Sequence, residues 1–182
     1  MAGINRALSQ YRTFSELRKA KGVECVFLSH QKRDKSVCET IAEYLLDADI
    51  DVYFDEYDAD LKFEKQKNNP KGITNCIKKG INNSSHMLCI ISPNTISSKW
   101  VPWEIGYGYD KTDLSVLTLK GIEDSELPAY LLTAELIRGT RSLNRYLSKI
   151  TSQLVSLMES TDLIKSYNDS DHPLDSVLDW NL

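Results

Sequence analysis

Short apolar segments that end in polar loops recur along this chain, and helical patterns separate them. The most apolar of them is 84–92, SSHMLCIIS, which is bounded by Ser84 and Ser85 and followed by Pro93. Apolar runs of this length are typical of strands that are buried on both faces of a parallel sheet. Strands that alternate with helices predict βαβ units with right-handed crossovers. The chain should therefore form a mainly parallel sheet with helices on both sides.

The same reading gives the order of the elements. Strands are expected at 23–29, 49–54, 84–92, 114–120 and 134–139. Apolar residues at helical spacing predict helices around 37–45, 73–81 and 143–157, and another helix opens near 100. Asp34 is suited to cap the first of these helices. The fold class that we expect is a flavodoxin-like three-layer α/β sandwich around a central five-stranded sheet.

The two ends of the chain differ from this pattern. Residues 1–22 carry Ile4, Leu8, Tyr11 and Leu17 near helical spacing, which predicts an added N-terminal amphipathic helix. Residues 23–159 hold the α/β domain. Residues 160–182 form a polar, acidic tail that is either loose or docked through Leu178 and Trp180.

Composition narrows the class of protein. The chain has 182 residues, which fits one domain with extensions. Its formal charge of −4 is poorly suited to a phosphate backbone, so we expect no nucleic-acid partner. The four cysteines have no metal or disulfide spacing and are interpreted as buried free thiols. No signal peptide or membrane span is expected, which predicts a cytoplasmic protein without a membrane partner.

Ligand sites of parallel α/β sheets lie beyond the carboxyl ends of the strands. The loops to inspect are therefore SHQKRD, DEYD and SPNTISSKW, which follow the first three strands. None is a glycine-rich phosphate loop, so a Rossmann dinucleotide site and a P-loop are not supported. The chain also lacks the GxSxG turn of a serine hydrolase. The stretch 55–72 is polar and long, and is expected to be a functional loop.

The segment 98–108, SKWVPWEIGYG, is the strongest candidate for chemistry. Trp100, Trp103 and Glu104 stand at i, i+3 and i+4, which places them on one side of a helix. Pro102 suits the first turn, so Glu104 would lie where the helix dipole favours an ionised carboxylate. Two core tryptophans beside a capping glutamate are one interpretation of this pattern. A ligand pocket with a charged carboxylate is the other.

Three segments resemble, in order, the motifs of Toll/interleukin-1 receptor (TIR) domains, especially bacterial ones. They are VECVFLSHQKRDK at 23–35, DIDVYFDEYD at 49–58 and INNSSHMLCIISPNTISSKWVPWEI at 81–105. The resemblance covers roughly residues 23–150. Such a short, stand-alone chain also resembles the TIR sensor of Thoeris antiphage defence.

The resemblance implies roles for individual residues. In enzymatic TIR domains the glutamate of the third motif, here Glu104, is essential for cleaving NAD+. Trp100 and Trp103 would line the same pocket. The remaining contacts would come from the loop after the first strand, Ser29, His30 and Arg33, and from the end of the second strand, Phe54 and Asp55.

The implied chemistry needs no cofactor and no metal, because NAD+ is the substrate and its nicotinamide is already a cationic leaving group. One carboxylate would stabilise the oxocarbenium-like transition state, whereas ordinary glycosidases require a second carboxyl group. The implied partners are NAD+, further copies bound through TIR–TIR contacts, a phage-derived trigger, and a separate effector that senses an ADP-ribose-derived product.

Two alternatives remain open at this stage. The first is a non-enzymatic TIR adaptor that acts only through assembly. The second is another flavodoxin-like enzyme, such as a nucleoside deoxyribosyltransferase, which also places a glutamate at an anomeric carbon. The loop at 55–70 is longer and more charged than the usual TIR pattern, and this loop governs assembly and pocket opening in the family.

Overall fold

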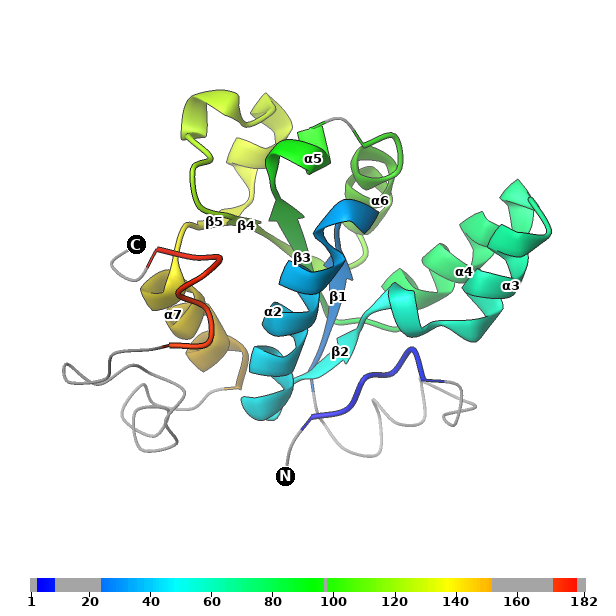
Figure 1. Ribbon diagram of the computed structural model, residues 1–182, viewed down its shortest axis with the longest axis horizontal. Coiled ribbons are helices and arrows are strands. Elements are labelled where there is room, and N and C mark those ends of the chain that lie inside the picture. Colours follow the sequence, from blue (N-terminus) through cyan, green and yellow to red (C-terminus); the bar gives the residue numbers. More distant parts are fainter. Residues whose placement is uncertain (1–2, 9–23, 97, 152–171, 180–182) are drawn as a thin grey trace.

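The central sheet has five strands, all parallel, in the order β2-β1-β3-β4-β5. They are β1 Cys25–Ser29, β2 Asp51–Tyr53, β3 His86–Ile91, β4 Asp113–Thr118 and β5 Glu135–Ile137. The computed structural model describes residues 3–8, 24–96, 98–151 and 172–179 (Figure 1). The expected fold class is confirmed, and each expected strand is present with slightly shorter bounds.

Each strand buries alternate residues on the two faces of the sheet, as a pleated backbone requires. In β1, Val26 and Leu28 face one core, and Cys25 and Phe27 face the other. The middle strands β1 and β3 are buried on both faces, which explains their continuous apolar sequence.

Helices cover both faces and complete the three layers (Figure 1). One face packs against α2 Lys35–Asp47 and α7 Thr140–Thr151. The other packs against α4 Pro70–Asn82, α6 Val101–Gly108 and the 3-10 turn η4 Ala129–Thr133. Shorter elements are η1 Lys32–Asp34, η2 Asp55–Tyr57, α5 Pro93–Ile96 and η3 Asp124–Glu126.

The stretch expected as a long loop is helical, so that prediction was wrong. Helix α3, Ala59–Gln66, begins where the Asp58 carboxylate accepts from the backbone N–H groups of Asp60 and Leu61. Helix α4 follows at once, capped by Asn69 with Pro70 in its first turn. The two helices form a hairpin that projects from the sheet (Figure 1). Charged residues suit it because most of its surface meets water.

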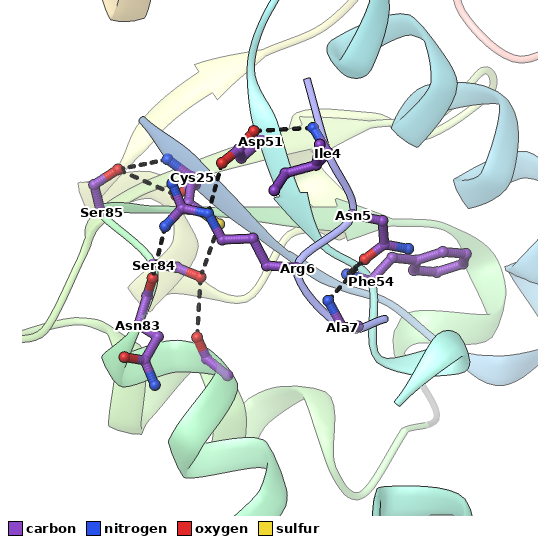
Figure 2. A network of polar contacts seen from close by, with 11 residues as sticks. Ile4, Asn5, Arg6, Ala7, Cys25, Asp51, Phe54, Asn83, Ser84 and Ser85 are labelled. Atoms are coloured by element: carbon purple, nitrogen blue, oxygen red, sulfur yellow. Dashed lines mark hydrogen bonds and ion pairs between the residues drawn. The ribbon is translucent and has the colours of Figure 1, made fainter. Parts of the chain in front are cut away.

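The N-terminal residues 3–8 form no helix, which corrects that part of the prediction. They run beside the edge strand β2, where Asn5 pairs in parallel with Val52. Arg6 is fully buried, and its Nε lies 2.7 Å from Asp51 Oδ2 (Figure 2). The edge strand needs a partner for its free backbone groups, and these residues supply one. Residues 9–22 of the predicted helix lie outside the described residues.

The C-terminal tail docks on the domain through Leu174 and Leu178, both fully buried in the α2–α7 core. Asp179 pairs with Gly139 just before α7. Docking through Leu178 is therefore confirmed. Trp180, and Leu154 and Leu157 of the expected last helix, lie outside the described residues.

The four cysteines are free thiols, as expected. Cys25, Cys38 and Cys89 are buried, whereas Cys76 is only half-buried on α4. Within the described parts of the chain, no helix is long and apolar enough to cross a membrane.

Candidate functional site

A cavity of about 560 Å³ opens beyond the carboxyl ends of β1, β2 and β3. This is the position that a parallel sheet offers to ligands, because the loops there diverge. We call it the site cavity. Its lining residues are His30, Gln31, Lys32, Asp55, Glu56, Lys65, Ile73, Ile77, Ser98, Lys99, Trp100 and Glu104.

Glu104 lies in the first turns of α6 and points to the end of β1. Its Oε2 accepts a hydrogen bond from Ser29 Oγ at 2.6 Å, and both residues are buried. Ser29 is the last residue of β1, and its hydrogen bond to Glu104 explains why a serine ends this apolar strand. The structure therefore places a carboxylate at the cavity wall, with a single hydrogen bond from a described neighbour holding it.

Burial, and to a smaller extent the nearby Asp55, raise the pKa of Glu104 to about 7. The Ser29 hydrogen bond and Lys65 act in the opposite direction. The helix dipole was expected to favour the ionised carboxylate, and burial acts against that preference. The backbone N–H of Glu104 already donates to the Trp100 carbonyl, and its side chain turns into the protein interior. Desolvation favours the protonated form there, in opposition to the dipole.

His30 and Asp55 form the opposite wall of the site cavity. His30 Nδ1 lies 3.2 Å from the Leu28 carbonyl oxygen and 3.9 Å from Asp55 Oδ1. The His30 ring packs on Phe54, which is fully buried behind it. Lys65 Nζ of α3 lies 3.7 Å from Asp55 Oδ2. Burial raises the pKa of Asp55, and His30 and Lys65 lower it.

The two tryptophans have different surroundings, although both were expected to line one pocket. Trp100 lines the site cavity and is 43% exposed. Trp103 is not among the cavity's lining residues; it stacks on Tyr107 with ring centroids 5.8 Å apart. The two indoles meet edge to face at 5.9 Å. Trp103 therefore supports Trp100 from outside the site cavity.

The loop after β3 is fixed by Asp34. This residue stands before α2, but its carboxylate makes no capping bond there. It accepts from Ser92 Oγ at 2.5 Å and from Asn94 Nδ2 at 2.6 Å. Instead of the expected capping bond, Asp34 makes hydrogen bonds that connect the loop after β1 to the loop after β3. Both loops belong to the rim of the site cavity.

Of the predicted site residues, the structure brings together Ser29, His30, Asp55, Trp100 and Glu104. Phe54 lies behind the wall, and Arg33 is exposed on η1 outside the lining. Sequence reasoning missed Lys65, Glu56, Lys32 and Lys99. The capping signals of Asp58 and of Asn69 with Pro70 could have revealed the helices that carry Lys65 to the cavity.

A flavodoxin-like sheet with a buried glutamate and an exposed tryptophan at the carboxyl ends of its strands defines the class of this protein: an α/β domain with a cavity at that end of the sheet. The chain belongs to the TIR domain family, whose match covers residues 26–150. A comparison with curated proteins found no match. TIR domains include both NAD+-cleaving enzymes and adaptors.

Proposed function

We propose that this protein cleaves the nicotinamide–ribose bond of NAD+, with Glu104 as the catalytic residue. The observation that carries the proposal is the position of Glu104: it is buried at the wall of the site cavity and anchored by Ser29. A TIR scaffold that served only for assembly would have no need of a buried carboxylate facing a cavity, because that burial lowers its stability.

The chemistry requires a negative charge beside the anomeric carbon. As nicotinamide leaves with the bonding electron pair and becomes neutral, positive charge develops on the ribose. The Glu104 carboxylate would stabilise that charge from its buried position in the cavity wall. Trp100 would pack against a flat ring of the dinucleotide. His30 and Asp55, on the opposite wall, would contact the rest of the substrate.

We further propose that the product is an ADP-ribose-derived signal in antiphage defence, read by a separate effector, and that TIR–TIR contacts and a phage-derived trigger control the activity. This part of the proposal rests on the resemblance of the chain to Thoeris sensors. Cyclisation or conjugation would occur if an acceptor other than water captures the ribosyl cation.

The test is to incubate the purified full chain with NAD+, alone, with a crowding agent and with phage-infected lysate, and to resolve products by chromatography and mass spectrometry. Glu104→Gln is the test variant, and Glu43→Gln, an exposed change on α2, is the matched control. We expect nicotinamide release from the wild type and the control and none from Glu104→Gln. The second product identifies the acceptor.

A non-enzymatic adaptor is the second candidate, and one observation favours it. Phe63 on the projecting helix α3 is 52% exposed, as a side chain in an assembly contact would be before assembly. If no condition releases nicotinamide although light scattering shows oligomers, and Phe63→Ala abolishes those oligomers, the adaptor function is the correct one.

A further inference from the structure

The opposite wall of the site cavity carries a group of side chains that the proposed cleavage chemistry does not use fully. One ring nitrogen of His30 and one oxygen each from Asp55 and Glu56 lie within 4.8 Å of one another. All three residues line the site cavity. His30 and Asp55 were expected in one pocket from the sequence, whereas Glu56 was not among the expected site residues. The pairing of β1 with β2 brings all three together.

His30 has an unused lone pair in a buried position. Its side chain is only 3% exposed, and Nδ1 lies at hydrogen-bonding distance from the Leu28 carbonyl oxygen. A carbonyl only accepts, so Nδ1 carries the proton and Nε2 is left with its lone pair. Among the described residues, Nε2 has no hydrogen-bond partner. A backbone carbonyl bonded to the other nitrogen is the usual support of a metal-binding histidine.

Asp55 also has an unused acceptor. Its Oδ2 faces Lys65, whereas its buried Oδ1 has no hydrogen-bond partner among the described residues. Lys65 does not close the group, because its side chain is 46% exposed and lies 3.7 Å from the other oxygen. Two buried polar atoms without partners in one group indicate a ligand, since leaving such atoms unpaired is costly.

We propose that His30, Asp55 and Glu56 bind a divalent cation at the wall of the site cavity. One imidazole nitrogen and two carboxylate oxygens suit an ion such as Mn²⁺ or Zn²⁺, which accepts mixed nitrogen and oxygen ligands. The nitrogen that lies 3.9 Å from Asp55 Oδ1 is Nδ1, so the carboxylates of Asp55 and Glu56 would rotate toward Nε2 when the ion binds. Bonds of roughly 2.1 Å would then hold opposite ligand atoms roughly 4.2 Å apart. The remaining coordination positions of the ion would face the cavity.

The test uses Mn²⁺ itself as the probe. The chelator-treated, purified full chain is titrated with Mn²⁺, and the free ion is followed by electron paramagnetic resonance. We expect one saturable ion per chain. Glu56→Gln should weaken the affinity by about tenfold or more, as should Asp55→Asn, because each removes a ligand. Glu43→Gln makes the same charge change on the exposed face of α2 and should leave the affinity unchanged.

Circular dichroism of each variant shows whether it folds, and Glu56→Gln keeps the test valid if Asp55→Asn does not, since Glu56 is only half-buried. The proposal is overturned if the wild type binds no Mn²⁺, or if Glu56→Gln and Glu43→Gln bind it equally well. No NAD+ is used in this titration. Its outcome is therefore independent of whether the chain cleaves NAD+.

Discussion

Burial of Glu104 has opposite consequences for catalysis and for stability. A carboxylate in a desolvated site interacts more strongly with a developing positive charge than one in water. The same desolvation raises its pKa to about 7, so that near neutral pH a large part of the protein carries the proton instead of the charge. Such perturbed groups in cavities are typical of functional sites.

The activity should therefore depend on pH through Glu104. If the ionised form is the active one, kcat for nicotinamide release should rise from pH 6 to 8 and reach a plateau above about pH 8. Asp55 raises the pKa of Glu104, whereas Lys65 lowers it. Lys65→Gln should shift the midpoint to higher pH, because it removes a positive charge. A rate that is independent of pH between 6 and 8 would contradict this assignment.

The stability of the folded protein should also depend on pH through Glu104, but it should fall as pH rises, whereas the activity should increase. The pKa is raised in the folded state relative to the ordinary value of 4.5, so this contribution to stability falls as pH rises from about 4.5 to 7. Above pH 7 the cost reaches roughly 3 kcal/mol at most. Glu104→Gln should thus raise the melting temperature by several degrees at pH 8 and leave it nearly unchanged at pH 4.5. A lower melting temperature at pH 8 would show that the charge is compensated.

At the scale of elements, the start of α6 places one tryptophan in the site cavity and the other outside it: Trp100, the N-cap residue, lines the cavity, whereas Trp103 in the helix does not. Trp100→Ala should raise KM for NAD+ about tenfold, because the side chain lines the cavity and offers a stacking surface. Trp103→Ala is the matched control on the same helix, since its ring packs on Tyr107. It should lower stability and change KM little. Equal changes in KM would show that both rings meet the substrate.

The contact of α4 with β2 leaves no room for a larger residue at Gly80. A Cβ atom there would lie 2.4 Å from Cε1 of Tyr53, whose hydroxyl is held by Asp58. Gly80→Ala should therefore destabilise the protein by about 1–3 kcal/mol in chemical denaturation. Gly106→Ala on α6 meets nothing within 4 Å and should stabilise it slightly. The reverse order would show that Tyr53 moves freely.

Elements were easier to predict than their ends. All five strands and the helices carrying Ile41 and Ile77 were predicted, because two-sided burial imposes continuous apolar runs and a buried helix face imposes its period. Helix α3 was missed since only Leu61 of it is buried, so its charged sequence has little apolar period. Residues 3–8 of the predicted N-terminal helix are not helical because they find backbone partners on β2 instead.

At the scale of the whole molecule, the N-terminal residues are part of the domain. Arg6 crosses the amino ends of the strands and joins Asp51 of β2 to the turn before β3, where its Nη1 lies 3.4 Å from the Asn83 carbonyl oxygen (Figure 2). Ile4 donates its backbone N–H to the same Asp51 carboxylate. One buried ion pair thus holds residues 3–8 against the amino ends of the strands, at the end of the sheet opposite to the site cavity.

Removing one member of this ion pair leaves the other charge buried. Arg6→Ala should lower the free energy of unfolding by about 3–5 kcal/mol, measured by urea denaturation. Arg145→Ala, at an exposed position of α7, should change it by less than about 0.5 kcal/mol. If the two variants unfold alike, residues 3–8 contribute little to the stability of the domain.

The sequence by itself determined the parallel α/β fold, because apolar period and turn residues are local properties that burial imposes on each segment. It also placed Glu104 and Trp100 beside one ligand position, since strand ends of a parallel sheet converge. Only the tertiary structure decided the raised pKa of Glu104, the position of Trp103 outside the site cavity, and the place of Glu56 beside His30 and Asp55. These properties depend on desolvation and on contacts between distant segments, which no local pattern encodes.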